Sequence, residues 1–208
     1  MWTGLGIAAV VGLSGWMAAS LWVKRGVAEP AFDRVAQDGD VELRRYGATI
    51  VAATEVEGER DAALNEGFRR LAGYIFGKNQ RSAKIAMTAP VSAARSEKIA
   101  MTAPVSAVGL RDGGFRVTFA MPAGYTLESL PEPVDPRVKL EVVPGREVAA
   151  IRFSGWARTE AIEAHSAELL AWASARGREV DGEPVLAQYD PPFAMPLMRR
   201  NEILLTLR

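Results

Sequence analysis

The chain of 208 residues has no cysteine and only one histidine, His165. The absence of cysteine excludes disulfides, thiolate metal sites and a cysteine nucleophile. A single histidine excludes a metal site built on two histidines of one chain, and it leaves only His165 for a Ser-His-Asp triad. No Gly-x-Ser-x-Gly sequence supplies the serine elbow of such a triad. We therefore expect that the protein is not an enzyme.

Neither sign of charge is in excess. Lys and Arg together number 25, as do Asp and Glu, so the net charge is zero. Without a basic excess we expect no nucleic-acid partner. The hydrophobic content of 49% is enough to build the core of one domain.

Charge is also absent from residues 1–23, which are mostly apolar. About 20 such residues span a bilayer, and Trp2 and Trp22 lie where interfacial anchors are expected. The sequence therefore predicts a single-pass membrane anchor within residues 1–28, with a cleaved signal peptide as the alternative. Lys24 and Arg25 follow the run, which by the positive-inside rule favours a cytoplasmic domain.

A ten-residue sequence, Lys-Ile-Ala-Met-Thr-Ala-Pro-Val-Ser-Ala, occurs at residues 84–93 and again at residues 98–107. The period is too short for a solenoid, and there are only two copies. Larger apolar side chains alternate with small or polar ones, which predicts one strand per copy that ends or bulges at its proline or lies at an edge of the sheet. Identical copies cannot fill one position, so we expect one copy in the sheet core and the other as an edge strand or excursion.

Periodicity elsewhere predicts several strands and two helices. The expected strands are residues 41–46, 49–56, 115–119, 138–142, 147–153, 185–189 and 201–207. Residues 60–76 form the first helix, with Gly77 at its stop. The second runs over residues 159–176, with Thr159 as N-cap and Gly177 at its stop. Residues 29–39 are expected to be a linker and residues 122–136 a loop.

A faint duplication links the two helices. Val51-Ala52-Ala53 and then Gly58 precede the first helix, while Val148-Ala149-Ala150 and then Gly155 precede the second, with an offset of 97 residues. Strands outnumber helices and do not strictly alternate with them, so an α+β fold is favoured over a doubly wound sheet.

Four ordered motifs resemble those of the SOUL family, also called the haem-binding protein family. They are Val41-Glu42-Leu43-Arg44-Arg45-Tyr46; Phe68-x5-Tyr74-Ile75-x-Gly77-x-Asn79; Lys-Ile-x-Met-Thr-x-Pro-Val of the repeat; and Tyr189-Asp190-Pro191-Pro192-Phe193 leading to Arg199-Arg200-Asn201-Glu202. The resemblance implies a haem- or tetrapyrrole-binding domain over residues 29–208. It also implies a curved antiparallel sheet or distorted β-barrel built from two pseudo-repeated halves with two main helices. Similar bacterial members imply an exported, tethered domain, which leaves the side of the membrane open.

Haem binding needs an apolar slot and basic or polar groups for the propionates, and tight binding also needs an axial ligand. From the resemblance we predict that the slot uses the first helix and the Tyr-Asp-Pro-Pro segment. Its predicted residues are Leu64, Phe68, Leu71, Phe193 and Met195, with Arg199 for a propionate. The alternatives are plain core packing and, for the arginines, a buried ion pair with Glu202 that fixes the last strand.

The candidate iron ligand is His165, whose alternative role is that of a boundary residue on the apolar stripe of the second helix. The family pattern is incomplete elsewhere. Some members carry a histidine where Arg45 stands and a basic residue where Asn65 stands, and a lysine of some members falls near Ala194 or Met195. We therefore expect weak haem binding through apolar contact. Two other functions stay open, an enzyme such as a hydrolase acting on a hydrophobic small molecule, and a protein-interaction module.

Overall fold

The computed structural model describes residues 27–80, 96–191 and 193–208. The predicted anchor of residues 1–23 and the first copy of the repeat, residues 84–93, lie outside the described residues. Within the described part of the chain, every helix is too short or too polar to cross a membrane.

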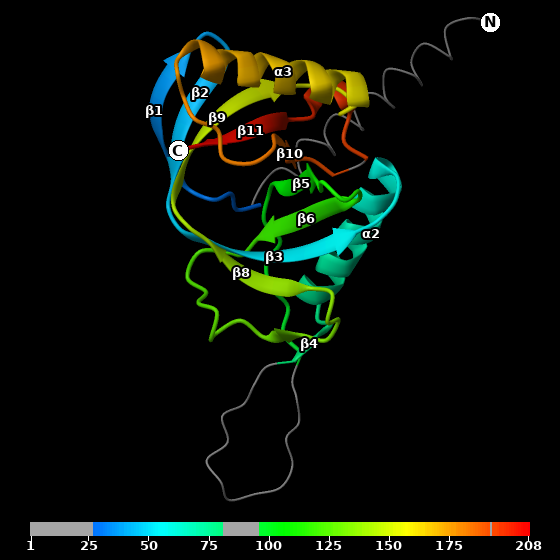
Figure 1. Ribbon diagram of the computed structural model, residues 1–208. Coiled ribbons are helices and arrows are strands. Elements are labelled where there is room, and N and C mark those ends of the chain that lie inside the picture. Colours follow the sequence, from blue (N-terminus) through cyan, green and yellow to red (C-terminus); the bar gives the residue numbers. More distant parts are fainter. Residues whose placement is uncertain (1–26, 81–95, 192) are drawn as a thin grey trace, which may run out of the picture.

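The fold is α+β, with two helices on a mostly antiparallel sheet of nine strands (Figure 1). The order across the sheet is β1-β2-β9-β11-β10-β5-β6-β3-β8. The strands are β1 Phe32–Asp38, β2 Val41–Tyr46, β3 Thr49–Val56, β5 Val105–Gly109, β6 Phe115–Ala120, β8 Lys139–Val143, β9 Arg146–Phe153, β10 Val185–Gln188 and β11 Asn201–Leu207. The other elements are helices α2 Arg60–Ile75 and α3 Thr159–Ala175, the small β4 Asn79–Gln80 and β7 Glu132–Pro133 pair, and the 3-10 helix η1 Pro196–Met198.

The sheet consists of two halves that match at the offset of 97 residues. Strands β3 and β9 begin and end at positions 97 residues apart, and they have the same pattern of buried and exposed side chains. Each is followed by a helix. Strand β3 pairs with β8 and β6, and β9 pairs in the equivalent way with β2 and β11. The halves meet where β10 pairs with β5, so the duplication seen in the sequence corresponds to a pseudo-twofold arrangement of the sheet.

Each helix covers one half of the sheet on the same face. Helix α2 packs on β3 and β6 through the fully buried Leu71, and α3 packs on β9 and β11 through the fully buried Leu169. Burial of a leucine side chain contributes roughly 1.5–3 kcal/mol. Gly67 allows the close approach of α2 to the sheet, because a Cβ there would lie 2.6 Å from Cγ2 of Val117. Neither helix of the described residues lies on the opposite face of the sheet.

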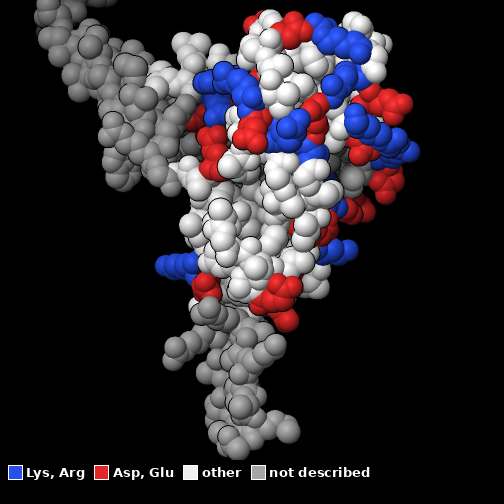
Figure 2. Space-filling view, turned by 90° about the vertical axis from the view of Figure 1, so that its left-hand side faces the viewer, with Lys and Arg blue, Asp and Glu red and all other residues white. Residues whose placement is uncertain are grey.

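Charged side chains do not form a single-sign surface on the side shown in Figure 2. Basic and acidic residues are interspersed over its upper half, and its middle is mostly uncharged. Opposite charges on neighbouring strands form ion pairs, such as that between Arg45 of β2 and Glu147 of β9, 3.6 Å apart.

Two sequence-based expectations were wrong. Residues 29–39 were expected to be a linker but contain β1, an edge strand whose pairing with β2 supplies hydrogen bonds although its side chains are mostly exposed. Exposed edge strands lack the apolar alternation by which a strand is found from sequence. Thr159 was expected to be the N-cap, but Arg158 holds that position, in an extended conformation, and makes no side-chain capping bond.

The second copy of the repeat also differs from its prediction. Its strand, β5, begins after Pro104, whereas the pattern predicted a strand that ends or bulges at the proline or lies at an edge. Residues before the proline are held individually: Ile99 is buried and donates its N–H to the carbonyl of Ile75, and Ala103 donates to the carbonyl of Ala28. This copy therefore contributes to the core, as we expected for one of the two.

Removing residues 94–107 is expected to lower the free energy of unfolding by less than about 1 kcal/mol, because shortening a loop changes its closure entropy slowly. The remaining copy supplies the same ten residues to β5, with Ala83 in place of Glu97. Glu97 meets the Asn79 side chain through backbone atoms, which alanine also has, but the bond from the Tyr125 hydroxyl to the Glu97 carboxylate, 3.1 Å long, is lost. Thermal melting of the shortened and full-length chains checks this. The matched control is a chain without residues 83–96, which retains Glu97. Failure of both deletions to fold would contradict it.

Candidate functional site

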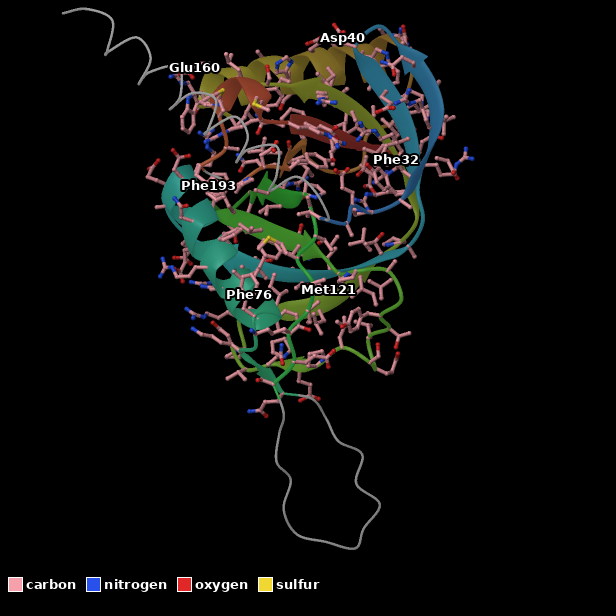
Figure 3. All side chains as sticks on the ribbon, turned by 180° about the vertical axis from the view of Figure 1, so that it is seen from behind. Phe32, Asp40, Phe76, Met121, Glu160 and Phe193 are labelled. Atoms are coloured by element: carbon pink, nitrogen blue, oxygen red, sulfur yellow. The ribbon has the colours of Figure 1, made fainter. Side chains whose placement is uncertain are left out.

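Large apolar side chains are exposed in the middle of α2 and on the segment between β10 and β11. Phe193 is 59% exposed and Phe68 is 36% exposed, and Leu197 is still more exposed. In Figure 3 Phe193 is drawn beside the end at which α2 begins, while Phe76 lies at its other end. Exposed apolar side chains that cluster mark ligand or partner sites. We call Phe68, Phe193, Met195 and Arg199 the helix-end surface.

Of the predicted slot residues on α2, only Phe68 offers a large exposed side chain. Its ring stands edge-to-face on Phe119, with centroids 5.5 Å apart, which fixes its orientation. Leu64 is half-buried and packs against the core of the second half. Leu71 is 0% exposed and lies in the core, so its predicted role as a slot residue is corrected to that of core support beneath the helix.

The segment after β10 holds the other predicted residues. Met195 is half-buried and directly precedes η1. The carbonyl of Pro196 accepts bonds from the N–H groups of Gly155 and Arg199, both at 3.0 Å, which ties the segment to the end of β9. The helix-end surface therefore rests on backbone that is fixed by hydrogen bonds.

Arg199 supplies the positive charge of this surface. Its Nε donates to the carbonyl of Ala194 at 2.9 Å, and its guanidinium lies 3.9 Å from the centre of the Trp156 ring. Burial lowers the pKa of Arg199 below its ordinary value. A partly desolvated guanidinium favours an anionic group beside it.

The candidate ligand His165 makes two side-chain contacts within the protein. Its ring stacks on Phe153 of β9 with centroids 4.8 Å apart, and its Nδ1 lies 3.4 Å from Oε2 of Glu168 on the same helix. These contacts are those of a boundary residue. Arg45, which stands where some family members carry histidine, is exposed and faces Glu147.

A buried charge network fixes the last strand. Glu202 is 0% exposed and accepts bonds from Arg44 Nη1 at 2.6 Å, Arg44 Nη2 at 3.1 Å, the Tyr189 hydroxyl at 2.7 Å and Arg200 Nε at 2.9 Å. The pair of Arg200 with Glu202 confirms the buried ion pair considered from the sequence. The central role of Arg44 was missed, because nothing in the sequence relates β2 to a strand that starts 155 residues after it ends.

Burial opposes the negative charge of Glu202, but the bonds and charges of Arg44, Tyr189 and Arg200 outweigh it, and the net effect lowers the pKa of Glu202. Burial raises the pKa of the Tyr189 hydroxyl, and the neighbouring Glu202 carboxylate raises it further. Tyr189 therefore remains a neutral donor to Glu202 at physiological pH.

A cavity of about 210 Å³ lies on the sheet face opposite the helices, lined by both halves. We call it the central cleft. Its walls include equivalent residues of the two halves, such as Val51 of β3 and Val148 of β9. Sequence analysis missed it because its lining comes from alternate positions of many strands, none of which is distinctive alone.

Comparison with known proteins gives one family. The sequence model described as "SOUL heme-binding protein" matches residues 27–206. Mouse "Heme-binding protein 1" is 30% identical over 144 residues, which cover 69% of this chain and 70% of that protein. Human "Heme-binding protein 2" is 44% identical over 62 residues, which cover 29% of this chain and only 30% of the human protein.

Two solved structures share the fold. The C-terminal domain of EcmrR superposes with a TM-score of 0.57 at 10% identity, covering 81% of this chain and 96% of the other. A protein described as a hydrolase from Listeria innocua superposes with a TM-score of 0.51 at 16% identity, covering 84% and 94%. At such low identity these likenesses show the fold alone.

Proposed function

This chain belongs to the SOUL heme-binding protein family, and from that premise we propose that its domain binds haem or a related tetrapyrrole at the helix-end surface, for carriage or buffering. The observation that carries the proposal is the exposure of Phe68 on α2 and of Phe193 on the segment that also holds the partly desolvated Arg199. The two phenyl rings suit a flat apolar macrocycle, and Arg199 suits a propionate.

The fit favours haem held without a strong axial bond. Arg45 replaces the histidine of some family members, and the contacts of His165 are with Phe153 and Glu168. Burial of an aromatic side chain contributes roughly 1.5–3 kcal/mol, and part of such gains is lost to the entropy of association. We therefore expect a dissociation constant in the micromolar range or weaker. This corresponds to a binding free energy of about −8 kcal/mol or less favourable.

Replacing His165 with alanine is expected to change the hemin dissociation constant less than about tenfold, or 1.4 kcal/mol, because the bonds of its ring are made with the protein. Titrations of both chains with hemin, followed by the Soret band, measure the change. A much larger loss, accompanied by disappearance of a low-spin spectrum, would show that His165 binds the iron.

A binding role is preferred over an enzymatic one. The chain lacks cysteine, and its single histidine stacks on Phe153. Among the described residues, groups of three or more His, Asp or Glu side chains placed to hold a metal ion are absent. The likeness to a Listeria protein described as a hydrolase concerns the fold alone.

A membrane tether is the second part of the proposal. It is supported by residues 1–23, which carry no charge. The contacts of the folded domain begin only a few residues later: the carbonyl of Ala28 accepts a bond from the N–H of Ala103, and Glu29 pairs with Arg200. An anchor placed there leaves the domain intact.

We expect the full-length chain to stay in the membrane pellet after alkaline carbonate washing, because about 20 apolar residues span a bilayer. A chain without residues 1–26 is the control, and it should be recovered folded in the supernatant. Recovery of the full-length chain in the soluble fraction would contradict the anchor.

A further inference from the structure

The central cleft carries a feature that haem binding at the helix-end surface does not use. Its wall is built from pseudo-symmetric pairs, in which residues 97 positions apart face the same cavity. Val51 matches Val148, and Tyr46 matches Val143. These pairs, with Leu204 of β11 and Val108 of β5, make the wall largely apolar. An apolar cavity of this kind suits the apolar body of a ligand.

Arg146 breaks the symmetry, because its counterpart in the first half is Thr49. It stands opposite Tyr46 in the register of β2 and β9, with its guanidinium 5.8 Å from the centre of the Tyr46 ring. Within the described part of the chain, no carboxylate lies at ion-pair distance from Arg146, and burial lowers its pKa. One end of the cleft is therefore lined by a desolvated cation that has no acidic partner among the described residues.

The other charged residues of the cleft already have partners. Arg116 pairs with Glu55 at 3.4 Å and with Glu141. The carboxylate of Glu29 receives two bonds from Arg200, both at 3.0 Å. Burial raises the pKa of the Tyr46 hydroxyl, which keeps it neutral and able to donate to an anion. The charge that remains for a ligand is thus positive and lies at Arg146.

We propose that the central cleft binds a small apolar carboxylate, with its body against Val51, Val148 and Leu204 and its carboxylate against Arg146. A buried cation that lacks an anion is unfavourable, and a carboxylate in bidentate contact relieves this. The volume of about 210 Å³ lies below the roughly 300–1,000 Å³ of sites for drug-sized ligands. The cleft therefore takes a ligand of one or two rings, and the haem macrocycle is too large for it.

Calorimetric titration of the full chain with 2-naphthoate tests the proposal, with uncharged 2-naphthamide as the matched ligand. We expect saturable naphthoate binding that weakens at least tenfold in Arg146→Gln, and naphthamide binding that is weak to both chains. Arg152→Gln is the control, since Arg152 is an exposed residue of the same strand outside the cleft. This control should bind naphthoate within twofold of the unmodified chain.

A second variant tests the location independently of the charge. Ser106 lines the cleft on β5, and Ser106→Phe should fill the cavity and remove naphthoate binding while the protein remains folded by circular dichroism. Phe193→Asp should leave naphthoate binding unchanged, which separates this site from the haem surface. Equal naphthoate affinity in the unmodified chain and Arg146→Gln, or full binding by a folded Ser106→Phe chain, would overturn the proposal.

Discussion

Replacing Glu202 with alanine is expected to lower the free energy of unfolding by about 3–5 kcal/mol, the loss typical of breaking a buried ion pair from one side. Arg44 is almost fully buried, and without Glu202 its guanidinium loses the acceptor of its two interstrand bonds. Tyr189 and Arg200 lose a partner as well. Urea denaturation followed by circular dichroism measures the change.

The control for this variant is Glu147→Ala. Glu147 also joins two arginines, Arg45 and Arg178, but both are considerably exposed. Exposed pairs contribute up to about 1 kcal/mol, so this variant should lose far less stability. Equal losses in the two variants would show that the Glu202 network contributes no more than a surface pair.

The Glu202 network also predicts a pH dependence. A carboxyl group with a lowered folded-state pKa stabilises the protein above its unfolded pKa of about 4.3. That contribution is lost as the pH falls through the lower pKa of the folded state. Between these two values, unmodified protein should lose stability with falling pH more steeply than Glu202→Gln, because glutamine does not titrate.

Replacing Phe193 with aspartate is expected to weaken hemin binding by more than about a hundredfold, or 2.7 kcal/mol. The change removes an aromatic contact and places a carboxylate against the macrocycle without a partner. Phe68→Asp should abolish binding for the same reason, although it also disturbs the packing on Phe119. Phe193 is therefore the cleaner test, because its exposed ring contributes less to the fold.

Phe76→Asp is the matched control for the hemin titration. Phe76 is 56% exposed, close to the 59% of Phe193, but follows the other end of α2 (Figure 3). Its replacement introduces the same charge and should leave the hemin dissociation constant within about twofold. Equal losses in Phe76→Asp and Phe193→Asp would mean that the effect is one of charge or folding and not of the helix-end surface.

Much of the fold follows from apolar periodicity. Strands 41–46, 49–56 and 201–207 were predicted from their apolar patterns with their observed bounds. The helices were predicted from their apolar stripes, and the offset of 97 residues indicated the two halves of the sheet. Edge strand β1 was missed because its stability comes from backbone pairing with β2, which its own side chains do not reveal.

The candidate sites were less visible from sequence. Phe68 and Leu71 lie on one predicted stripe, but the close packing of α2 buries Leu71 and leaves Phe68 partly exposed. Arg44 and the central cleft were missed because their partners come from strands distant in sequence, which only the tertiary structure brings together.

The most direct test of the haem surface uses the seven phenylalanines of the chain as reporters. Protein labelled with [15N]phenylalanine gives one backbone amide signal for each, and bound hemin broadens the signals nearest its iron. The account predicts selective broadening of Phe193 and Phe68, with Phe76 and the cleft residue Phe32 unaffected. Broadening of Phe32 while Phe193 and Phe68 stay sharp would contradict it and would place haem in the central cleft.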